Sequence, residues 1–92
     1  MPRLLVIDDE PGILHAFRRA FRTPDVELLT ASTAAEGLEA VASQAPDVVL
    51  LDINLPDLSG LETFRRLQQR DARTPVIFIT GHGTTESAIE AM

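Results

Sequence analysis

The chain has 92 residues, a formal net charge of −6 and no cysteine. This length suits one domain, and a hydrophobic content of 45% is enough to form its core. The acidic balance argues against direct contact with nucleic acid, and the lack of Cys excludes disulfides and thiolate metal sites. No apolar run is long enough to span a membrane or is typical of a signal peptide, so we expect a cytoplasmic domain.

The first predicted element is a strand at residues 4–7, an apolar run that ends at Asp8-Asp9. A helix is expected from Pro11, since proline is favoured in the first helical turn, with Asp9 or Glu10 as its cap. The apolar side chains that fall on one face of this helix are Ile13, Phe17, Ala20 and Phe21.

Residues 26–31 have a mixed composition and are expected to form an edge strand. The next helix is expected to begin at Ser32 or Thr33, with Glu36 placed for a capping box. The side chains expected to face inward from it are Ala35, Leu38, Val41 and Ala42.

The third strand is predicted at residues 48–51 and ends at Asp52. Ser59, with Glu62 three residues later, is expected to cap the third helix. Its inward side chains are expected to be Leu61, Phe64 and Leu67.

A fourth strand at residues 76–79 and a helix from Thr84 or Thr85 complete the pattern. Most of the strands are continuous apolar runs, which suit a parallel sheet covered on both faces. The alternation of strands and helices therefore predicts an α/β fold with a doubly wound parallel sheet and right-handed crossovers.

Polar residues follow three of these strands at their carboxyl ends, where open α/β sheets form their functional crevice. These residues are Asp8 and Asp9, Asp52, and Thr80. If the first and third strands are neighbours, the three carboxylates converge, and unit charges about 4 Å apart repel by roughly 4 kcal/mol at an effective dielectric of about 20. Such a cluster needs a proton or a cation, and hard oxygen ligands suit Mg²⁺. A carboxylate held against Mg²⁺ can also attack phosphorus and give an aspartyl phosphate.

With these residues the chain resembles the receiver domain of bacterial two-component response regulators. The matching residues are Asp8-Asp9, Asp52 with Pro56 and Gly60 in the loop that follows, and Thr80-Gly81. The resemblance runs through residues 1–92 and implies a flavodoxin-like receiver fold with strand order 2-1-3-4.

The resemblance also implies a role for each site residue. Asp52 is expected to be the phosphoacceptor and Thr80 the switch hydroxyl. Asp9 and Asp52 are expected to ligate Mg²⁺ directly with the backbone carbonyl of Asn54, while Asp8 acts mainly through water. The domain would then be a signalling switch and not an enzyme. A sensor histidine kinase would phosphorylate it, and it would control an output domain, of a transcriptional kind, in the parent chain.

The chain departs from the family at its C-terminal side. Receivers carry a Lys at the end of a fifth strand and then a fifth helix, whereas this sequence has no Lys and stops at Met92. We therefore expect a C-terminally incomplete receiver domain over residues 1–92. The strand at residues 76–79 would then have an open edge, which favours self-association.

The main alternative is a phosphatase or phosphotransferase that works through an aspartyl-phosphate intermediate. Such hydrolases have an Asp two residues after the nucleophile as acid and base, and Asn54 stands there in this chain. Asp57 in the same loop is interpreted as a solvated residue and not as a metal ligand. A pure interaction module is disfavoured because Asp8, Asp9 and Asp52 are all present.

Overall fold

A computed structural model describes residues 1–79 of the chain. Strands and helices alternate in the order β1 (Arg3–Ile7), α1 (Pro11–Ala20), β2 (Glu27–Ala31), α2 (Ala34–Gln44), β3 (Val48–Asp52), α3 (Gly60–Arg70) and β4 (Val76–Ile79). Thr80 and the helix expected from Thr84 or Thr85 lie outside the described residues. Of the helices within residues 1–79, none has the length and apolar character that crossing a membrane requires.

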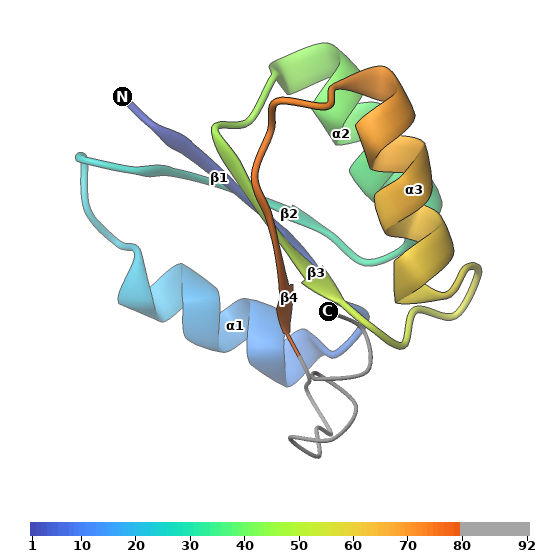
Figure 1. Cartoon of the computed structure of the whole chain (residues 1–92). Helices are drawn as coiled ribbons and strands as arrows, with labels where there is room; N and C mark the ends of the chain where they lie inside the picture. The colour runs from blue at the N-terminus through green and yellow to red at the C-terminus, as the bar shows by residue number, and fades with distance from the viewer. Residues whose placement is uncertain (80–92) are drawn as a thin grey trace.

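The four strands form one parallel sheet in the order β2-β1-β3-β4, with α1 on one face and α2 and α3 on the other (Figure 1). The predicted doubly wound α/β fold and the strand order are therefore confirmed. The chain runs from β1 outward to β2 and then returns to place β3 on the other side of β1. The strand order thus switches direction between β1 and β3, where such folds bind ligands.

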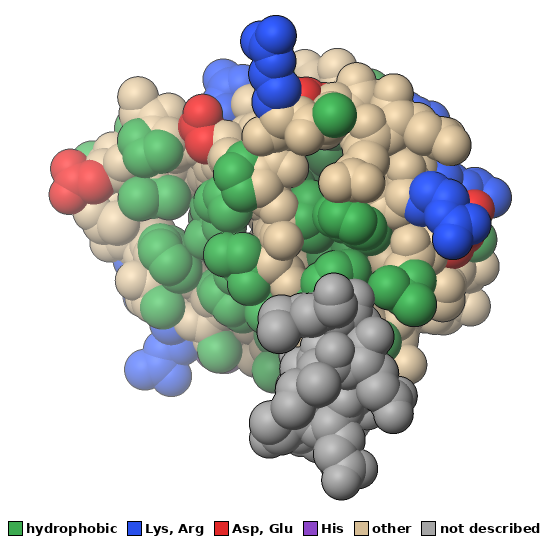
Figure 2. Space-filling model, viewed as in Figure 1, with side chains coloured by type: hydrophobic (Ala, Val, Ile, Leu, Met, Phe, Trp, Pro, Cys, Tyr) green, Lys and Arg blue, Asp and Glu red, His purple; other side chains and the backbone are tan. Residues whose placement is uncertain are grey.

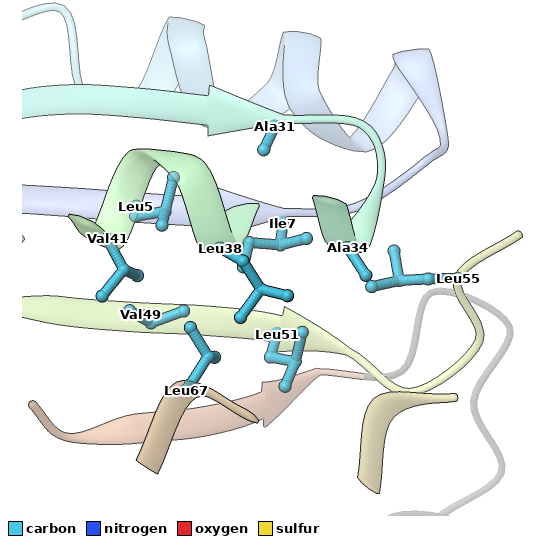
Figure 3. Packing of buried hydrophobic residues seen from close by; sticks show 10 residues of the cluster. All are labelled: Leu5, Ile7, Ala31, Ala34, Leu38, Val41, Val49, Leu51, Leu55 and Leu67. Carbon is cyan, nitrogen blue, oxygen red and sulfur yellow. The ribbon is translucent and has the colours of Figure 1, made fainter. Parts of the chain in front are cut away.

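Two hydrophobic cores, one on each face of the sheet, explain why the strands lack alternation. Leu5 and Ile7 of β1 point into the core beneath α2 and α3, while Leu4 and Val6 point into the core beneath α1. Figure 3 shows the first of these cores, formed by Leu5, Ile7, Ala31, Ala34, Leu38, Val41, Val49, Leu51, Leu55 and Leu67. Because both faces of the central strands are covered, every position in them is best filled by an apolar residue.

The buried face of α2 differs from the predicted one. Leu38 and Val41 are buried as expected, but Ala35 and Ala42 are exposed, and Ala34 and Gly37 are buried in their place. The buried face therefore lies closer to the N-terminal part of α2 than predicted. Alanine suits either face, so only the docking of α2 on the sheet decides between them.

The predicted face of α3 is wrong at Leu61, which is 51% exposed near the start of the helix. Thr63 is fully buried instead, and its hydroxyl donates to the carbonyl oxygen of Ser59 at 2.8 Å. That bond satisfies the buried hydroxyl, which lets a polar residue occupy the core face. Leu67 is buried and Phe64 packs at the edge of the core, as predicted.

The face of α1 is also only partly as predicted. Phe17 and Phe21 pack against the second core, but Ala20 is exposed and Leu14 is the residue that α1 buries.

The predicted helix caps at Thr33 and Ser59 are confirmed. Thr33 Oγ1 accepts a hydrogen bond from the Glu36 amide at 3.1 Å, and Ser59 Oγ accepts one from the Glu62 amide at 3.2 Å. The capping box at α2 is shifted, because Glu36 Oε2 accepts from the backbone amide of Ser32 and not from that of Thr33. Glu10 occupies the N-cap position of α1, within the predicted choice.

The backbone conformation at the C-terminal end of α2 can be tested by mutation. Ala45 follows the helix with φ 46° and ψ 63°, a left-handed conformation that disfavours any residue with a Cβ atom. We expect Ala45→Gly to increase the free energy of unfolding by about 1 kcal/mol. Urea denaturation measures this, and Ala42→Gly, an exposed position inside the same helix, should instead lose about 1 kcal/mol. Equal losses in the two variants would contradict the described C-cap.

The strand β4 lies at one end of the sheet, as expected, and within residues 1–79 no further strand pairs with its outer side. Ile77 of this strand is 53% exposed. Figure 2 shows hydrophobic side chains gathered on this side of the molecule. Exposed strand edges of this kind are templates for pairing with other chains. Self-association through this edge stays a prediction.

Candidate metal centre

Three acidic side chains meet at the carboxyl ends of β1 and β3. The two strands pair in parallel with Ile7 opposite Leu51, so Asp8 and Asp52 come next on neighbouring strands. Carboxylate oxygens of Asp8, Asp9 and Asp52 lie within 4.8 Å of one another. The structure thus brings together the three acids expected to converge, and their oxygens could hold a metal ion.

Backbone hydrogen bonds orient the two buried acids. Asp8 is fully buried and its Oδ1 accepts the amide of Glu10 at 2.9 Å. Asp52 is 5% exposed and its Oδ1 accepts the amide of Asn54 at 3.2 Å. In both cases one carboxylate oxygen accepts a hydrogen bond from the backbone amide two residues later and so forms a local turn. The second oxygen of each carboxylate takes no part in this bond. Asp9, by contrast, is exposed to solvent.

One oxygen of the cluster lacks a hydrogen bond. Asp8 Oδ2 is buried and has no hydrogen-bond partner among the described residues. Buried polar atoms are nearly always bonded, and exceptions often mark the place of an ion or a water molecule. An orphaned carboxylate oxygen beside two other carboxylates fits a divalent cation with oxygen ligands.

The electrostatics of the cluster favour neutralisation. The pKa of Asp52 is raised from 3.8 to about 6, mainly by burial and further by the charges of Asp8 and Asp9, although the hydrogen bond from the Asn54 amide acts to lower it. Burial is also the main cause that raises the pKa of Asp8, with smaller contributions from Asp9 and Glu10. A proton on one carboxylate or a cation among them relieves the same repulsion.

The loop after β3 is closed on itself and anchored at both ends. The amide of Gly60 donates to the carbonyl oxygen of Ile53 at 2.7 Å, and Asn54 forms an antiparallel bridge with Ser59. Leu55 inserts between these points into the core beneath α2 and lies beside Ala34 (Figure 3). The loop that begins at Asp52 is therefore built into the fold and is not a loose connection.

Asp57 makes contacts that its sequence position did not indicate. Its two carboxylate oxygens accept hydrogen bonds from the amides of Ala34 at 2.9 Å and Ala35 at 3.0 Å, the first residues of α2. These bonds are the main cause that lowers the pKa of Asp57. Asp57 is exposed to solvent, as interpreted, and is not among the described acids that cluster at the metal site, but it also caps α2. Its partners stand more than twenty positions away along the chain, and no local pattern points to them.

The comparison with known families decides what this arrangement is. A family model described as the response regulator receiver domain matches residues 4–92. The chain belongs to the response regulator receiver domain family. Receiver domains are signalling switches that bind Mg²⁺ at acidic residues, and the position of the three acids in this receiver agrees with that property.

Curated relatives of this receiver are regulatory proteins. It is 33% identical over 90 residues to the regulatory protein AtoC of Escherichia coli strain K12, covering 98% of this chain and 20% of AtoC. It is 39% identical over 92 residues to the transcriptional regulatory protein KdpE of Mycobacterium tuberculosis, covering all of this chain and 40% of KdpE. The receiver thus spans less than half the length of these relatives.

Solved structures share the fold. A response regulator receiver domain protein from Clostridium thermocellum superposes with a TM-score of 0.85 at 37% identity, over 100% of this chain and 75% of that one. NtrX from Brucella abortus, solved in complex with ADP, superposes with a TM-score of 0.87 at 34% identity, over 99% of this chain and 21% of that one.

Proposed function

We propose that this receiver is a phosphoacceptor switch in which Asp52 takes a phosphoryl group from a partner sensor histidine kinase. The observation that carries the proposal is the placing of Asp52 at the end of β3, beside two acids at the end of β1. Its buried carboxylate is directed by the bond to the Asn54 amide. With a pKa of about 6, Asp52 is mostly ionised at neutral pH and so can act as a nucleophile.

Asp8, Asp9 and Asp52, with the backbone carbonyl of Asn54, would hold Mg²⁺, and the orphaned Asp8 Oδ2 supports this choice of ligands. When bound, Mg²⁺ supplies positive charge that offsets both the carboxylates and the incoming phosphoryl group. A carboxylate oxygen of Asp52 then attacks phosphorus. The new O–P bond forms as the P–N bond to the kinase histidine breaks, and the imidazole nitrogen leaves with the electron pair.

We further propose that Thr80 is the switch hydroxyl and that the phosphorylated receiver controls a transcriptional output domain in the cytoplasm. The regulatory names of the relatives support an output of this kind. Asn54 supports a switch rather than a phosphatase or phosphotransferase, because an amide cannot act as the acid and base that turnover requires.

The test is phosphorylation by an acyl phosphate with Mg²⁺, followed by intact mass and by peptide mapping. We expect one phosphoryl group on Asp52, labelling that depends on Mg²⁺, and no labelling of Asp52→Asn.

We also expect Mg²⁺ at ten times its dissociation constant to increase the free energy of unfolding by about 1.4 kcal/mol.

Identical melting midpoints with and without Mg²⁺ would count against the metal site. Sustained release of inorganic phosphate from a phosphate ester would favour the phosphatase instead.

A further inference from the structure

The carboxylate of Asp57 joins two parts of the molecule that are distant in sequence. It stands in the loop after Asp52, yet both of its oxygens accept the first two amides of α2. The third amide of α2, that of Glu36, is bonded by Thr33. The free amides at a helix start are usually satisfied by a neighbouring side chain or by water. Here two of them are satisfied by the loop that leads away from the phosphoacceptor.

Other contacts also hold the same loop in position. Asp52 accepts the amide of Asn54, and Asn54 is bridged to Ser59 at the other end of the loop. Between these points Leu55 is fixed in the core and Asp57 is fixed to α2. A displacement of Asp57 would therefore be passed to the segment that carries Asn54.

We propose that Asp57 is a positioning residue for the metal site, which acts by clamping the loop of residues 53–59 to the N-terminus of α2. The inference rests on the proposed function, since it concerns the Mg²⁺ that Asp52 and Asn54 would bind. Residues that orient metal ligands from outside the ligand shell affect metal affinity although they do not touch the ion. Coupling of this kind is reciprocal, so bound Mg²⁺ also steadies the start of α2.

The test measures Mg²⁺ affinity of the 92-residue chain by isothermal titration calorimetry for four variants. Asp57→Asn removes the charge and one of the two acceptor oxygens, while Asp57→Glu keeps the charge but moves the carboxylate. We expect both to weaken Mg²⁺ binding by about tenfold.

Two control variants separate positioning from general effects. Thr33→Ala removes the other cap of α2, the bond from the Glu36 amide, and leaves Asp57 in place. Asp71→Asn removes a matched acid whose carboxylate bonds the Arg73 amide and the Thr74 hydroxyl before β4, at the opposite end of the sheet. Both controls should bind Mg²⁺ within about twofold of the wild type.

The outcomes divide cleanly. Wild-type Mg²⁺ affinity in Asp57→Glu would show that only the charge of residue 57 matters. Wild-type Mg²⁺ affinity in both Asp57 variants would show that Asp57 is a simple helix cap. Either result overturns the inference. An equal loss in Thr33→Ala would assign the effect to a weakened α2 and also overturn it. A wild-type chain that binds no Mg²⁺ would refute the proposed metal site itself, and the inference with it.

A measurement on the wild type keeps the test valid if a variant fails to fold. Hydrogen exchange of the Ala34 and Ala35 amides should slow when Mg²⁺ is added, while the Glu36 amide, which bonds Thr33, should change less. Equal exchange with and without Mg²⁺ at Ala34 and Ala35 would overturn the coupling.

Discussion

Replacing Asp52 by Asn is expected to stabilise the metal-free protein by about 3 kcal/mol at neutral pH. The side chain is 5% exposed, and its pKa is raised from 3.8 to about 6, mainly by this burial. A buried carboxylate with a raised pKa destabilises the fold when it is ionised, and the charges of Asp8 and Asp9 increase that penalty. Asparagine keeps the shape and can still accept the Asn54 amide, but it carries no charge.

The expected gain depends on pH with a definite sign. The folded state binds the Asp52 proton more tightly than the unfolded state. The protonation of Asp52 therefore stabilises the wild type below pH 3.8, and this stabilisation is lost as the pH rises through about 6. Asp57 and Asp71, whose pKa values are lowered by hydrogen bonds, act in the opposite direction and lose their contribution as the pH falls. The difference between wild type and variant isolates the effect of Asp52.

Urea denaturation in the presence of a chelator, from pH about 4 to about 8, measures this difference. We expect the two proteins to be close in stability at the acid end and to diverge as the pH rises. Asp25→Asn, which changes an exposed acid, should stay within about 0.5 kcal/mol of the wild type. Adding Mg²⁺ should narrow the gap, since the metal also neutralises the cluster. A gap that does not change with pH would contradict the raised pKa of Asp52.

Gly60→Ala is expected to destabilise the protein by about 1–3 kcal/mol and to weaken Mg²⁺ binding. A Cβ atom at Gly60 would lie 2.7 Å from the Cα atom and 2.9 Å from the carbonyl oxygen of Ile53, and 3.2 Å from the carbonyl oxygen of Asp52. All three are backbone atoms, so no side-chain rotation can relieve the clash. The backbone beside the phosphoacceptor must shift, and the 2.7 Å bond from the Gly60 amide to Ile53 must lengthen.

The matched control is Gly12→Ala near the start of α1, where an added Cβ atom would meet nothing within 4 Å. There the change should be neutral or should stabilise by up to about 1 kcal/mol, as expected for Ala over Gly in a helix. Chemical denaturation and a Mg²⁺ titration of both variants provide the comparison. If the Gly60→Ala protein is as stable as Gly12→Ala, the backbone of Asp52 and Ile53 does not lie as close to Gly60 as these distances indicate.

The local features of this protein were predictable from its sequence. The strands could be recognised because burial on both faces requires runs such as Val48-Val49-Leu50-Leu51. The caps at Thr33 and Ser59 could be recognised because the residues they bond stand three positions later in the chain. The meeting of Asp8 and Asp52 followed from a parallel pairing of their strands, which the order of elements already favoured.

Tertiary packing decided the rest, because the groups involved come from distant parts of the chain. The depth at which Asp52 is buried sets its pKa, and that depth depends on all the layers around it. The face that α2 buries depends on docking, since Ala34 and Ala35 are chemically alike. The role of Asp57 depends on amides twenty-two and twenty-three positions away. Short-range patterns in the sequence therefore determined the helices, the strands and the acids of the site. Contacts between these elements determined the pKa of Asp52 and the bonds of Asp57 that hold the loop in place.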